Sequence, residues 1–177
     1  MNWFLLGVAA AVVFALLRRR ESETSPVAPL ALKRWDAPPG QHRLEGHILE
    51  WVRKRLRESP APAREAFDEL PLPHRRVFAA RRLEAEVAEA GFSGFFRGRY
   101  EPIVLDAQEA LLAFGAKAHA RIVEEALAAR ELWLPWRRAA ALHRATRAFL
   151  LLDASAPLMA SRARYIESEG EAFSRLG

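Results

Sequence analysis

The stretch EAGFSGFFRGRYEP, Glu89–Pro102, holds three glycines and three phenylalanines within eight residues. The phenylalanines are Phe92, Phe95 and Phe96. Their i, i+3, i+4 spacing places the three rings on one face of a single helical turn. We expect Gly91 to end one helix, the short turn to bury its rings, and Gly98 to form a second turn before the next helix. The stretch is thus predicted to organise the packing of a helical protein.

The same glycines do not match the common phosphate-binding loops. Their spacing differs from the dinucleotide pattern, no predicted strand precedes them, and no Lys-Ser or Lys-Thr pair follows. The alternative to a purely structural turn is an enzyme active site, in which neighbouring carboxylates act as general acid and base. These carboxylates are Glu84, Glu86, Glu89, Asp106 and Glu109. Ser93 lacks the strand-to-helix turn of a hydrolase nucleophile, and no catalytic residue is predicted.

The rest of the chain repeats one signal, an amphipathic helix followed by glycine or proline. Apolar residues between Leu44 and Leu56, for example, recur at the spacing of one helical face. A later helix is expected to end at Gly115. No segment shows the apolar alternation that is typical of a strand. The predicted fold class is therefore all-α, with a compact multi-helix domain over residues 41–177.

Residues 1–20 predict a transmembrane signal anchor. MNWFLLGVAAAVVFALLRRR has no charged side chain before Arg18 and then three arginines. Its apolar part would span about 25 Å as a helix, close to a hydrocarbon core of about 30 Å, and the arginines keep the remaining chain in the cytoplasm. We expect a single-pass protein of the bacterial inner membrane, with a cleaved signal peptide or a buried core helix as alternatives. Residues 21–40 contain four prolines and predict a linker.

The distribution of charge argues against general nucleic-acid binding. The formal net charge is +5, but three of the arginines directly follow the predicted anchor. The sequence after them has 24 Lys and Arg residues against 22 Asp and Glu residues, which is a weak electrostatic footprint for a nucleic-acid binder. The chain has no cysteine, and its five histidines lack a metal-ligand spacing. Neither a metal nor a cofactor is predicted.

A basic helix end predicts a contact with the membrane surface. The segment WVRKRLR, Trp51–Arg57, contains Arg53, Lys54, Arg55 and Arg57. The linker would hold these side chains near an anionic lipid leaflet, where each basic residue contributes on the order of 1 kcal/mol. A solvated helix face is the first alternative, and a nucleic-acid-binding stripe is the second.

A second segment, ELWLPWRR at Glu131–Arg138, predicts a contact with a partner. Its candidate contact residues are Trp133, Trp136, Arg137 and Arg138. Exposed tryptophans beside arginines are typical of protein interfaces. The alternative is that the two tryptophans cap one end of the helical bundle.

Three segments together resemble a known bacterial family. They are LEAEVAEAGFSGFFRG, AQEALLAFGAKAHARIVEEAL and LLDASAPLMASRARYIESEGEAF. They resemble the DNA-mimic protein C-terminal domain family, a domain of unknown function, over about Pro71–Phe173. The matching positions are Glu86, Gly91, Phe92, Phe96, Gly115, Ala116, Leu152, Asp153, Tyr165, Ile166 and Phe173. The resemblance implies an all-helical fold and, in function, the binding of a protein.

The polar residues of that family's glycine motif are replaced in this chain. Glu89 and Gly98 stand at its two Asn positions, Gly94 stands at its Gln and Phe95 at its Tyr. The nearly neutral sequence after the anchor also lacks the dense negative surface that DNA mimicry requires. We therefore expect a membrane-anchored, cytoplasmic protein-interaction module whose partner is an unidentified protein.

Overall fold

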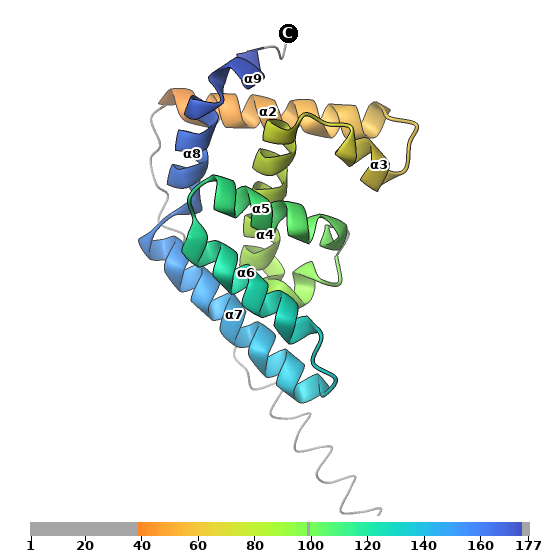
Figure 1. Ribbon diagram of the computed structural model, residues 1–177, viewed down its shortest axis with the longest axis vertical. Coiled ribbons are helices and arrows are strands. Elements are labelled where there is room, and N and C mark those ends of the chain that lie inside the picture. Colours follow the sequence, from red (N-terminus) through yellow and green to blue (C-terminus); the bar gives the residue numbers. More distant parts are fainter. Residues whose placement is uncertain (1–38, 99, 175–177) are drawn as a thin grey trace, which may run out of the picture. The chain divides into compact units, whose positions relative to one another are not determined.

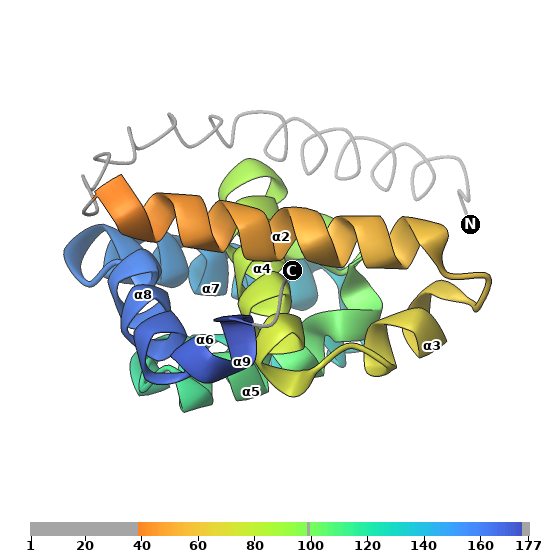
Figure 2. The ribbon, with the colours of Figure 1, turned by 90° about the horizontal axis from the view of Figure 1, so that it is seen from above.

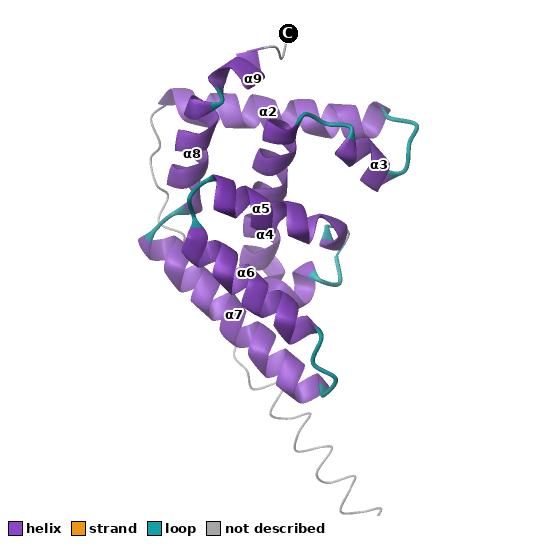
Figure 3. Ribbon diagram, in the orientation of Figure 1, coloured by secondary structure: helices purple, strands orange, loops and turns teal. Residues whose placement is uncertain are grey.

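The computed structural model describes residues 39–98 and 100–174, and these contain helices and turns but no strand (Figures 1 and 3). The elements are α2 (Pro39–Glu58), α3 (Ala63–Asp68), α4 (Leu72–Phe95), the 3-10 turn η1 (Glu101–Ile103), α5 (Val104–Ala113), α6 (Lys117–Arg130), α7 (Pro135–Ser155), α8 (Leu158–Ser168) and α9 (Gly170–Ser174). The all-α prediction is confirmed for this part of the chain. The predicted anchor at residues 1–20 lies outside the described residues, and among those described no helix is both long and apolar enough to cross a membrane.

Proline and glycine fix several of the helix boundaries. Proline precedes the first helical residue of α3, α4 and α8, where its missing N–H would have no helical partner. Gly115 follows α5 with a φ of 74°, and the next backbone N–H, that of Ala116, donates to the Leu111 carbonyl at 2.8 Å. This is the closure expected when a left-handed glycine ends a helix.

Gly91 bends α4 near its C-terminal end. Its φ of 66° and ψ of 178° are not helical, so the segment from Phe92 onward forms a separate turn. The backbone N–H of Phe92 donates to the hydroxyl of Thr146 in α7, which in turn donates to the Leu142 carbonyl. A Cβ at Gly91 would lie 3.0 Å from the Thr146 hydroxyl. The position therefore favours glycine both for its backbone conformation and for its contact with α7.

The turn after Gly91 delivers two of its three rings to the core. Phe92 and Phe95 are buried, and the ring of Phe92 meets Phe149 of α7 edge to face at 5.7 Å. Phe96 follows the last residue of α4 and is only partly buried, with the Arg130 guanidinium over its ring at 5.6 Å. The expectation that the rings are buried is therefore met only in part by Phe96, which packs against the edge of the core and has Arg130 over its ring.

The long helix α4 is the centre of the packing in residues 39–174. It contacts α2, α5, α7, α8 and α9, while α6 and α7 pack against each other as neighbours (Figures 1 and 2). Its buried face contains Val77, Ala80, Leu83 and Val87, which recur at the helical period. A fully buried Val or Leu side chain contributes about 1.5–3 kcal/mol, and the single methyl group of Ala less. Ile48 of α2 and Phe67 of α3 belong to the same core cluster, so these two helices share one core with the later ones.

Candidate interaction surface

The connection between α6 and α7 and the first turn of α7 expose one tryptophan each. We call Leu132–Arg138 the tryptophan loop. Within it the side chain of Trp133 is 83% exposed and that of Trp136 is 65% exposed. Leu132 is also exposed, so the loop presents several large apolar groups to solvent. The alternative in which these tryptophans cap the bundle does not fit such exposure.

Local backbone chemistry, rather than packing of the indoles, shapes this loop. The Leu132 N–H donates to the Ala129 carbonyl at the end of α6, and extended Leu134 precedes Pro135, the first residue of α7. The Arg138 N–H then donates to the Leu134 carbonyl at 3.0 Å, closing the first turn of α7. The indoles are therefore not needed to hold the loop in place.

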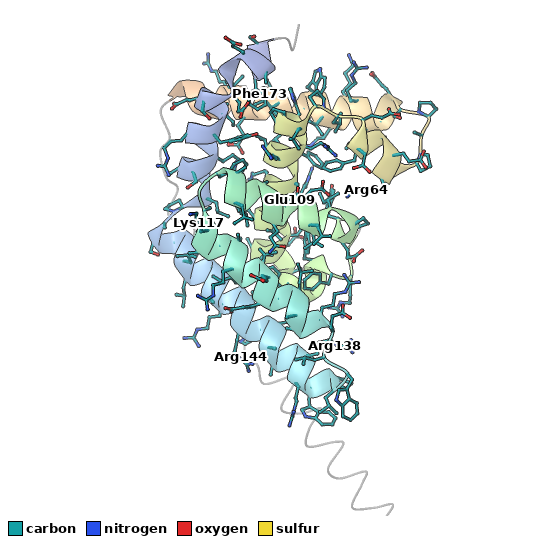
Figure 4. The ribbon with its side chains drawn as sticks, in the orientation of Figure 1. Arg64, Glu109, Lys117, Arg138, Arg144 and Phe173 are labelled. Atoms are coloured by element: carbon teal, nitrogen blue, oxygen red, sulfur yellow. The ribbon has the colours of Figure 1, made fainter. Side chains whose placement is uncertain are left out.

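Two arginines follow the tryptophans on the first turn of α7. Figure 4 shows Arg138 at the end of α7 that adjoins the loop. Arg137 and Arg138 are both exposed, and neither has a carboxylate within ion-pair distance among residues 39–98 and 100–174. The structure thus brings together the four predicted contact residues, two apolar and two positively charged, on one exposed segment.

The basic residues at the end of α2 do not form one surface. Arg53 and Arg57 lie four residues apart on one side of the helix and both pair with Glu50. Lys54 pairs with Glu58, at 3.9 Å. The Arg55 guanidinium lies over the Trp51 ring at 5.5 Å, on another side of the helix. A flat membrane could meet only part of this set at once.

Two of the five carboxylates near the glycine turn, Glu84 and Asp106, belong to separate ion pairs. Glu84 of α4 binds Arg162 of α8, whereas Asp106 of α5 binds Arg64 of α3 at 2.6 Å. An acid–base pair needs two carboxyl groups that face one reacting centre. Glu84 and Asp106, each held by its own arginine, do not provide that arrangement.

A buried ionic cluster joins three helices. The sequence pattern did not predict it. Arg162 is 1% exposed; its Nε donates to Glu45 of α2 at 2.9 Å and its Nη1 to Glu84 at 2.8 Å. Burial lowers the pKa of Arg162, but the two carboxylates outweigh burial and raise it overall. The sequence signal was present, since Arg162 lies four residues after Leu158 and four before Ile166, on the buried face of α8.

Two of the five histidines are buried within the described region. His74 lies between the rings of Trp51 and Phe173, and neither of its nitrogens has a hydrogen-bond partner. His119 lies 3.8 Å from Asp153, whose carboxylate accepts the Leu158 N–H at the start of α8. Burial lowers the pKa of both histidines and raises the pKa of Asp153. Among the described residues no group of three or more potential ligands could hold a metal ion.

The family described as DMP19-like protein matches residues 68–174. The match begins at the last residue of α3 and extends to the last residue of α9. It therefore includes the glycine turn, the tryptophan loop and Arg162, and it leaves α2 outside. Comparison with curated proteins and with solved structures finds no match. Because the match covers more than half of the chain, this chain belongs to the DMP19-like protein family.

Proposed function

We propose that the protein is a helical protein-interaction module held at the cytoplasmic face of the bacterial inner membrane by residues 1–20. Its contact surface is the tryptophan loop, with Trp133, Trp136, Arg137 and Arg138 as the contact residues. The observation that supports this function is the exposure of both indoles, 83% and 65%, on a loop whose backbone is fixed without them.

Large apolar groups that are exposed close together are typical of interaction sites. Tryptophan and arginine are enriched among the few residues that carry most of the binding energy at protein interfaces. Truncating such a residue commonly costs about 2 kcal/mol or more of binding free energy. Two exposed indoles and two exposed guanidinium groups therefore supply, on one short segment, the residue types that contribute most at protein interfaces.

The replacement of polar residues in the family's glycine motif agrees with a contact surface in another part of the molecule. Phe92 and Phe95 are used for packing, and Gly91 for the approach to Thr146. We infer that replacement of the motif's polar positions removes any polar binding surface at this turn in this family member. The near balance of charge after residue 20 likewise favours protein binding over imitation of DNA.

Proximity labelling in the native host tests the proposal. The full chain carries a C-terminal biotin ligase, and the labelled proteins are compared with those of a Trp133→Ala/Trp136→Ala variant. We expect the wild-type bait in the membrane fraction, labelling of cytoplasmic proteins, and loss of a defined subset in the variant. A matched control is Leu112→Ala/Leu151→Ala, which removes two exposed leucines elsewhere.

Two results would contradict this proposal in different ways. Identical labelling by the wild-type and tryptophan variants would remove the loop as the contact surface. A soluble bait, or labelling confined to periplasmic proteins, would contradict the anchor and its orientation.

A further inference from the structure

An apolar groove with an arginine rim lies apart from the tryptophan loop, since none of its lining residues belongs to Leu132–Arg138. We call it the arginine groove. It has a volume of about 430 Å³ and is formed by α2, α3, α4 and η1. Its walls include Phe67, Phe78 and Ile103, each of which is otherwise buried. Most ligand sites share this combination of a concave apolar wall and a few polar groups.

Four arginines and no acidic residue line this groove. They are Arg53, Arg57, Arg64 and Arg82. Two come from α2, one from α3 and one from α4, so the positive charge surrounds the apolar wall rather than lying on one helix. A ligand that enters the groove therefore meets guanidinium groups from three helices.

The environments of these arginines differ. Arg64 is held by Asp68 and Asp106 and also donates to the Pro102 carbonyl, while Arg53 and Arg57 share one carboxylate, that of Glu50.

Arg82 has no carboxylate within ion-pair distance in residues 39–98 and 100–174. Its guanidinium carbon instead lies 5.3 Å from the centre of the Phe78 ring and 4.9 Å from that of Tyr100. Contact with these two rings holds the cation beside the apolar wall, and its N–H groups can donate to an anion bound in the groove.

We propose that the arginine groove binds a short acidic segment of a partner protein that carries a bulky apolar side chain. The apolar side chain packs on Phe67 and Phe78, and an adjacent carboxylate pairs with Arg82. Further carboxylates of the segment meet Arg53 and Arg57. Charge complementarity selects this occupant: a planar guanidinium binds a carboxylate through two parallel hydrogen bonds, and several separated arginines suit several carboxylates.

This site is separate from the tryptophan loop, so the two proposals can fail independently. The test measures fluorescence anisotropy of a short fluorescein-labelled peptide of Glu, Asp and Phe with the full chain in detergent. Matched peptides replace either Phe by Ala or the acidic residues by their amides. We expect binding that requires both features and that weakens as salt is added.

Arg82→Gln is the principal variant, and we expect it to weaken peptide binding about tenfold or more. Arg53→Gln/Arg57→Gln changes only exposed rim side chains and should weaken binding about threefold or more, which keeps the test valid if Arg82→Gln unfolds. Arg121→Gln, an exposed arginine on α6, is the control and should bind as the wild type does.

The proposal is overturned if the wild-type chain does not bind the acidic peptide, or if the Ala peptide binds equally well. Equal binding by the groove variants and Arg121→Gln would also overturn it. Tighter binding of a labelled oligothymidine than of the peptide would assign the groove to nucleic acid instead. If the groove variants lose peptide binding but label the same neighbouring proteins as the wild-type bait, the groove proposal is supported independently of the tryptophan loop.

Discussion

Replacing Arg162 with methionine removes the side chain that ties α8 to α2 and α4. Two charge-assisted hydrogen bonds are lost, one to Glu45 and one to Glu84. Their carboxylates remain partly buried, and breaking a buried ion pair on one side commonly costs about 3–5 kcal/mol. Arg81 lies 3.8 Å from Glu45 and 3.6 Å from Glu84 and can neutralise part of the remaining charge. We therefore expect a loss near the lower limit, about 3 kcal/mol.

Thermal unfolding of the full chain in detergent measures this loss, which corresponds to a fall in Tm of about 6–12 °C. Arg121→Met is the matched control, because Arg121 pairs with Glu125 on an exposed face and such pairs contribute less than about 1 kcal/mol. Adding Glu45→Gln and Glu84→Gln to Arg162→Met should recover much of the stability, since no buried charge then lacks a partner. If Arg162→Met costs no more than Arg121→Met, the cluster does not hold these helices together.

Two further predictions concern glycine and histidine. Gly91→Ala should destabilise the protein by about 2 kcal/mol, because the backbone is left-handed and the new Cβ would meet Thr146. Gly115→Ala has the same backbone strain but meets no neighbour, so it should cost about 1 kcal/mol. Equal losses of unfolding free energy in urea would mean that the Thr146 contact adds nothing. Because burial lowers the pKa of His74 and His119, their neutral forms stabilise the fold above the ordinary value of about 6.5, and this contribution is lost as pH falls through the lowered pKa. His74→Phe should therefore reduce the fall in Tm between about pH 7.5 and about pH 5, and an unchanged slope would refute the role of His74.

The helical architecture could be predicted because its signals are local. Apolar residues repeat at the helical period, and prolines and glycines mark the ends of helices within a few residues of where they occur. Gly91 illustrates this, since its position before Phe92 and Phe95 already indicates a bend that directs rings inward. The ring of Phe96 is the exception, because its environment depends on Arg130 of a different helix.

The surfaces and the ionic cluster depend on contacts that are distant in sequence. Arg162 meets Glu84 and Glu45 across 78 and 117 residues, and nothing in the local pattern selects these partners. The arginine groove likewise exists only after α2 and α3 pack against α4. The exposure of Trp133 could not be separated from burial at a bundle end, because the same short segment fits both until the neighbouring helices are placed.

Site-specific photo-crosslinking tests the tryptophan loop most directly. A benzoyl-phenylalanine introduced at position 133 of the full chain in its native host should crosslink to one or a few cytoplasmic proteins upon irradiation. The same group at position 151, a half-exposed leucine on α7, should not capture them. Specific protein adducts at position 133 alone are the predicted result. Adducts to lipid, or the same protein adducts at both positions, would contradict a protein-binding surface at the tryptophan loop.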